Sequence, residues 1–69
     1  MSESVYRVTE FIGVSADSWE AAARNAVETA AQTVRDLRIA EATRFDVTIE
    51  DGKVANYRVR LDISFKYEG

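Results

Sequence analysis

The chain has 69 residues, neither cysteine nor histidine, and a formal net charge of −3 from nine basic and twelve acidic residues. This composition excludes disulfides, thiolate zinc sites, cysteine nucleophiles and the usual acid–base residue of neutral pH. Lys and Arg are not clustered as non-specific nucleic-acid binding requires. No apolar run approaches the roughly 18 residues of a membrane span, and no signal peptide opens the chain. We therefore expect a cytoplasmic protein with neither a nucleic-acid nor a membrane partner.

The length predicts a single small domain over residues 1–69, and the 46% hydrophobic content indicates a folded chain. Domains of this size bury little apolar surface, and crude accounting of their stability comes out near zero. With disulfides excluded, self-association is the expected source of additional burial.

Residues 5–14 are rich in β-forming types and predict a first strand that Gly13 ends. Its apolar residues fall on both parities, which is typical of a strand covered on both sides. Residues 15–20 predict a helix start with Asp17 or Ser15 as the N-cap, and the helix is expected to extend to about Asp36. Its apolar stripe is mostly Ala, so the helix can lie close to a sheet.

Two alternating stretches follow, after a strand start expected at about Ile39. Residues 44–50 and 57–67 both carry their apolar side chains at odd positions, and Asp51-Gly52 between them is a hairpin signal. Paired residues share a face, so each pair must sum to an even number. A two-residue loop would pair Glu50 with Lys53. The pattern therefore predicts a loop of odd length, namely a type I turn closed by a G1 bulge with Gly52 at positive φ.

The element order is β-α-β-β, which predicts a two-layer α+β domain with one helix on one face of a three-stranded antiparallel sheet. The helix returns the chain so that the first two strands are parallel. The last strand is then expected between them, giving the spatial order first, third, second.

No residue set for catalysis is present, so we predict that the protein is not an enzyme. Ser15 and Ser18 fit helix-start roles, and the carboxylates of the closing strands alternate with Arg as on a solvated face. Glu50 and Asp51 are the candidate metal ligands, with ordinary turn chemistry as the alternative.

The polar face of the last strand offers two alternatives, an anionic ligand or cross-strand charge pairs with Arg44 and Asp46. Trp19 fits a core or interface position, with stacking on a cofactor as the alternative.

Residues 5–68 resemble the dodecins, small β-α-β-β proteins that assemble into hollow dodecamers. The co-linear matches are Val5-Tyr-Arg-Val, Ile12-Gly-Val-Ser, Ala31-Gln-Thr-Val-Arg-Asp-Leu, Asp51-Gly-Lys-Val and Ile63-Ser-Phe-Lys. Many dodecins bind flavins between subunits, and some bacterial members bind coenzyme A. The resemblance therefore implies a homododecameric shell that binds, stores or sequesters a small ligand, with FMN or riboflavin as the family's ligand.

By family position, the ligand pocket would contain Ile39, Glu41, Asp46 and Arg58. Flavin-binding dodecins have Trp-Phe-Glu-Val where this chain has Ile39-Ala-Glu-Ala, so Ile39 replaces the stacking Trp and Glu41 is retained. Asp46 stands at a family Arg, and Arg58 at a family Gln. An aliphatic side chain cannot supply aromatic stacking, which is worth on the order of 1 kcal/mol beyond area burial.

Ser18-Trp-Glu and Leu37-Arg-Ile-Ala are similar to a second dodecin subgroup that lacks the flavin Trp, and for which calcium has been suggested as a ligand. The alternative to a flavin-type shell is thus a calcium-binding or purely structural variant without flavin.

Overall fold

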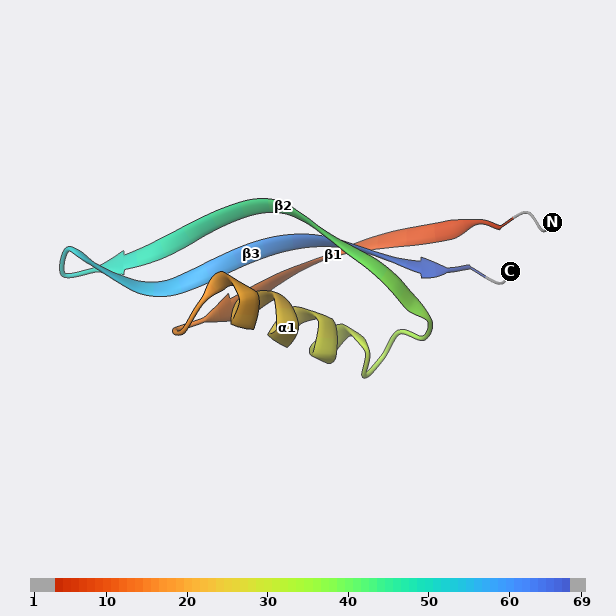
Figure 1. The fold of residues 1–69 in the computed structure, drawn as a ribbon, viewed down its shortest axis with the longest axis horizontal. Coiled ribbons are helices and arrows are strands. Elements are labelled where there is room, and N and C mark those ends of the chain that lie inside the picture. Colours follow the sequence, from red (N-terminus) through yellow and green to blue (C-terminus); the bar gives the residue numbers. More distant parts are fainter. Residues whose placement is uncertain (1–3, 68–69) are drawn as a thin grey trace.

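A computed structural model describes residues 4–67 and contains β1 (Tyr6–Ser15), α1 (Trp19–Ala30), β2 (Leu37–Glu50) and β3 (Lys53–Lys66). The strands form one antiparallel sheet in the order β1-β3-β2, and α1 lies on one of its faces (Figure 1). The predicted α+β fold and strand order are confirmed. No helix in the described part of the chain is long and apolar enough to cross a membrane.

The core lies between α1 and the sheet. Its buried residues are Ala22, Ala26, Ala30, Val59, Leu61 and Ile63. The small Ala side chains let α1 approach the sheet closely, mainly over β1 and β3. At Gly13 of β1 the approach is so close that a Cβ would overlap the carbonyl oxygen of Ala22 and lie 3.0 Å from the Cβ of Ala26. Gly13 is therefore required for packing and does not end the strand.

The helix is capped by Ser18, so the predicted caps Asp17 and Ser15 are both wrong. Ser18 has an extended backbone, and its Oγ accepts a hydrogen bond of 3.0 Å from the backbone N–H of Ala21. The Oγ of Ser15 instead accepts from the backbone N–H of Asp17 in the connection before the helix. The sequence places three good capping residues within four positions, and the packing of α1 on the sheet selects among them.

The helix ends at Ala30 and not near Asp36, and β2 begins at Leu37, two residues earlier than predicted. The apolar period of the helix continues in the sequence to Leu37, which misled the prediction. Leu37 instead pairs with Phe65 of β3, and Asp36, at φ 60°, turns the chain into the strand. Pairing within the sheet overrides local helix propensity here.

The β2–β3 turn differs from the predicted type I turn with a G1 bulge. Asp51 and Gly52 both have positive φ (53° and 74°), and Glu50 pairs with Lys53, which defines a two-residue type I′ turn. The parity requirement is met elsewhere, because Ile49 pairs with Val54 whereas Thr48 pairs with Asn56. Ala55 is therefore an extra residue in β3. Beyond this bulge, the apolar residues of β2 and β3 lie on the same face of the sheet.

The molecule is elongated, measuring 54 × 20 × 16 Å, with a radius of gyration of 14.3 Å. A compact chain of this length is expected to have a radius of about 11 Å. The β2–β3 hairpin extends beyond both β1 and α1 (Figure 1). Large apolar side chains remain exposed along the molecule, among them Val8, Ile39 and Ile49. One copy of the chain thus leaves much apolar surface uncovered.

Candidate functional site

The predicted ligand residues lie on the outer face of the sheet, the face opposite α1. Strand register places outer-face residues in rows across β1, β3 and β2, because side chains alternate between faces. The rows are Val14–Arg58–Asp46, Ile12–Arg60–Arg44, Glu10–Asp62–Glu41 and Val8–Ser64–Ile39. Ile39, Glu41, Asp46 and Arg58 therefore share this face.

A β-bulge at Thr43 brings Ile39 and Glu41 to the outer face. Arg44 pairs with Arg60 but Ala42 pairs with Leu61, so Thr43 is an extra residue in β2. After the bulge the odd positions of β2 face α1, whereas Ile39 and Glu41 before it face outward. Leu37 packs against the core again, because a further register shift lies between Leu37 and Ile39. Without the Thr43 bulge, Ile39 and Glu41 would lie on the side of the core. The Oγ1 of Thr43 donates a hydrogen bond of 3.3 Å to the carbonyl oxygen of Arg60.

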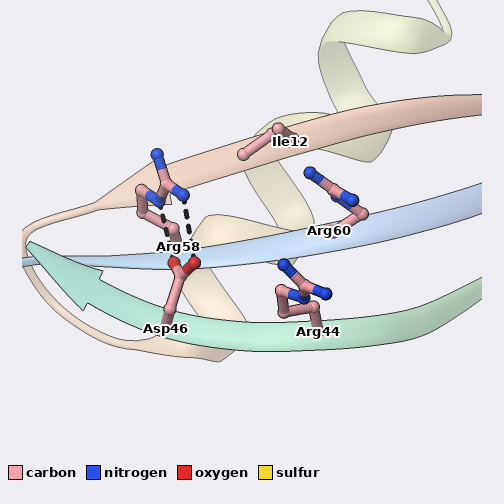
Figure 2. Close-up of a pocket in the computed structure, with 5 residues that line it drawn as sticks. All are labelled: Ile12, Arg44, Asp46, Arg58 and Arg60. Atoms are coloured by element: carbon pink, nitrogen blue, oxygen red, sulfur yellow. Dashed lines mark hydrogen bonds and ion pairs between the residues drawn. The ribbon is translucent and has the colours of Figure 1, made fainter.

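Asp46 and Arg58 form a bidentate ion pair across β2 and β3. The Nε of Arg58 donates to Oδ1 of Asp46 at 2.8 Å, and its Nη2 donates to Oδ2 at 3.0 Å (Figure 2). The hydrogen bonds from Arg58 lower the pKa of Asp46, the positive charges of Arg44 and Arg60 add to this, and partial desolvation opposes it. The same pair raises the pKa of Arg58 above its usual value. Of the two alternatives for this face, cross-strand charge pairing is observed at these two positions.

A small cavity of about 10 Å³ lies beside this pair, lined by Ile12, Arg44, Asp46, Arg58 and Arg60 (Figure 2). Arg44 and Arg60 are directly opposite each other on neighbouring strands. The Nε of Arg60 is buried and has no hydrogen-bond partner, and the nearest carboxylate oxygen, Oε2 of Glu10, is 3.8 Å away. Asp46 and Arg58 were in the predicted pocket set. Arg44 and Arg60 were predicted on the same polar face but not in the pocket, and Ile12 was missed. Both arginines have even numbers in the two alternating stretches, where the even positions are polar. This shared parity was the signal that they lie on the same face.

Ile39 and Glu41 do not line this cavity. Ile39 is 67% exposed two rows away, and Glu41 lies in the intervening row with Asp62 and Glu10. Rows on one face are about 7 Å apart along a strand. In a single copy, the four predicted residues therefore form two groups. Asp46 and Arg58 form the ion pair, and Ile39 and Glu41 lie in a more open region of the same face.

The metal candidates Glu50 and Asp51 are exposed at the tip of the β2–β3 hairpin. Within residues 4–67, no group of three or more acidic side chains is arranged to hold a metal ion. The acidic row of Glu10, Asp62 and Glu41 is in register across the sheet but does not form such a group either.

Trp19 lies on the inner face, on the opposite side of the sheet from Ile39. Its ring packs edge-on against Phe45 at 6.0 Å and Tyr57 at 5.1 Å between centroids. Its Nε1 donates a hydrogen bond of 3.3 Å to the backbone carbonyl of Asp46. Trp19 thus supports the strand that carries Asp46, and within one copy it lies on the opposite side of the sheet from position 39.

Comparison with known proteins accounts for nearly the whole chain. The dodecin family model matches residues 5–68. The chain is 41% identical to the calcium dodecin of Mycobacterium tuberculosis over 63 residues, covering 91% of this chain and 89% of the relative. It is 34% identical to the dodecin of Thermus thermophilus over 64 residues, covering 93% of each.

Solved structures agree with these relatives. The dodecin of Streptomyces coelicolor superposes with a TM-score of 0.94 at 46% identity, covering 100% of this chain and 99% of that one. The M. tuberculosis calcium dodecin, described as a calcium-chelating antigen with a novel calcium-binding site, gives a TM-score of 0.82 at 42% identity, covering 94% and 93%. The chain therefore belongs to the dodecin family.

Proposed function

We propose that this protein is the non-catalytic subunit of a homododecameric shell that binds, stores or sequesters a small ligand between its copies. The main support is the outer face of the sheet. This face carries the four family-position residues together with exposed apolar side chains such as Val8 and Ile39, and α1 covers only the opposite face. Association of copies through such a face would add the burial that a domain of this size lacks.

Flavin is the less favoured ligand of this shell. Ile39 offers no ring for stacking. At two further family positions, the polar groups of Arg58 and Asp46 are already engaged in their bidentate ion pair. For coenzyme A, no residues of this chain are assigned as a binding site. The ligand is instead expected to use the charged side chains of the face.

A calcium-binding or purely structural shell is the second candidate. It is favoured by the similarity to the relative named calcium dodecin. Since the described residues of one copy do not bring three acidic side chains together, calcium in this candidate would be held between copies by carboxylates such as Glu50 and Asp51.

Native mass spectrometry tests the assembly. We expect a dodecamer for the wild-type chain and dissociation for Ile39→Lys, which places an unpaired charge on the proposed contact face. Gln32→Lys adds the same charge at an exposed residue after α1 and serves as the matched control. A wild-type chain that stays monomeric would refute the shell.

Ligand identity is tested on the same assembled protein. Flavin fluorescence quenching should show weak binding, and Ile39→Trp should strengthen it about fivefold, the equivalent of about 1 kcal/mol of stacking. Tight flavin binding by the wild type, with no gain from Ile39→Trp, would show that Ile39 is not the limiting position. Stoichiometric calcium in untreated protein would favour the second candidate.

A further inference from the structure

We propose that Arg44 and Arg60 bind one compact oxyanion group, a phosphate or a carboxylate, on the outer face beside the Asp46–Arg58 pair. This inference rests on the proposed function, since it names the chemical class of the ligand held on that face. It also assigns binding roles to two residues that lie outside the family-position set.

The first support is a pair of like charges on neighbouring strands with only weak compensation, a single long ion pair from Arg60 to Glu10. Arg44 and Arg60 are direct cross-strand partners, an arrangement that destabilises a sheet when no counter-ion is present. The third position of their row is Ile12, which carries no charge. Within residues 4–67, Arg44 makes no ion pair, and the nearest carboxylate to Arg60 is that of Glu10 at 3.8 Å.

The second support is an unsatisfied donor. The Nε of Arg60 is buried without a hydrogen-bond partner, and 3.8 Å to Glu10 is beyond hydrogen-bond distance. Asp46 lies in the same cavity, but both of its oxygens are engaged by Arg58 (Figure 2). The Arg60 side chain as a whole is 37% exposed, so an oxyanion can approach its guanidinium group and supply the hydrogen-bond acceptors that Glu10 does not reach.

The size of the cavity and the charges around it favour a compact ligand group. A cavity of about 10 Å³ has room for about one oxygen atom, so the remainder of the ligand must lie outside, against Arg44. The next row along the sheet, Glu10, Asp62 and Glu41, is acidic and lies about 7 Å away. That row would repel an extended polyanion, whereas a single phosphate or carboxylate fits between it and the Asp46–Arg58 pair.

Isothermal titration of inorganic phosphate into the assembled full-length protein tests this site, with sodium chloride adjusted to hold ionic strength constant. We expect saturable binding, weakened about tenfold or more by Arg44→Gln and by Arg60→Gln, as for the loss of one charge-assisted hydrogen bond. Arg24→Gln removes the same charge from the exposed side of α1 and should leave binding unchanged. Arg44→Lys should retain part of the affinity, which separates lost binding from lost folding.

Succinate, titrated in parallel, distinguishes the two sources of an oxyanion group. Binding of succinate in place of phosphate would assign the site to carboxylates, and preference for phosphate would assign it to phosphoryl groups. Absence of saturable binding of either anion, or equal affinity in both Gln variants and the wild type, would overturn the proposal. Native mass measured on the same samples reports separately on the shell, since a monomer that still bound phosphate through Arg60 would refute the assembly alone.

Discussion

The two faces of the sheet are built from the same strands but have different environments. On the inner face, Val59, Leu61 and Ile63 of β3 are at most 2% exposed beneath α1. On the outer face, the alternate residues of β3 are polar, and the neighbouring strands add exposed apolar side chains such as Ile39. The inner face therefore holds one subunit together, whereas the outer face is the one that we propose contacts other copies and a ligand.

β1 illustrates the same difference within one strand. Its apolar residues on both parities indicated coverage on both sides, but α1 covers the side of Phe11 and Gly13 alone. Val8, Ile12 and Val14 remain exposed on the other side. The shell that we propose would cover them.

Replacing one isoleucine on each face should show the difference between the two faces most clearly. Ile63→Ala removes a fully buried side chain and should lower the free energy of unfolding by about 3 kcal/mol. Ile39→Ala should leave the subunit core intact and act on association, so its effect on thermal stability should vary with protein concentration. Thermal unfolding at several concentrations checks both variants, and equal, concentration-independent losses would contradict the assignment of the two faces.

The close contact between α1 and β1 predicts the next largest effect. Gly13→Ala should cost roughly 2 kcal/mol or more in urea unfolding, because the added methyl group meets the backbone of Ala22. Gly52→Ala is the matched control, since its added Cβ meets no atom and its cost of about 1 kcal/mol comes from the positive φ of 74°. A larger loss at Gly52 would show that the helix is not in tight contact with β1.

The cap of the inner-layer helix should have a smaller effect. Ser18→Ala removes the acceptor for the backbone N–H of Ala21 and should destabilise the protein by about 1 kcal/mol. Ser15→Ala, whose hydroxyl bonds a backbone N–H outside the helix, should cost less. Chemical denaturation compares the two, and the reverse order would return Ser15 to the capping role.

Acidification should give the smallest effect, on the outer face. Because Arg58 lowers the pKa of folded Asp46, the pair adds stability above the usual Asp pKa and loses it as pH falls through the lower folded value. Asp46→Asn should therefore be less stable than the wild type near neutral pH and converge with it below about pH 4. Asp51→Asn removes the same charge at the exposed turn and gives the background. Parallel pH profiles for the wild type and Asp46→Asn would contradict a stabilising pair.

The alternation in residues 44–50 and 57–67 predicted the faces of these parts of β2 and β3 correctly, and with them the positions of Asp46 and Arg58. The positions of Ile39 and Glu41 could not be predicted in this way, because the Thr43 bulge reverses the faces of residues 39–42. The loop of odd length that parity predicted at the hairpin was wrong, although one extra residue nearby does restore the faces. The bulge lies at Ala55 and not in the turn, because Asp51-Gly52 is well suited to a type I′ turn.

The sequence by itself determined the element order, the strand order and the chemical character of each face of β3. These follow from local alternation and periodicity, which any short stretch of the chain carries. The tertiary structure alone decided where the helix ends, which serine caps it, and where the three irregularities in strand pairing lie, at Arg38, Thr43 and Ala55. It also placed Arg44 directly opposite Arg60. Those features depend on the register between strands distant in the sequence, and register is set by how the whole sheet packs against α1.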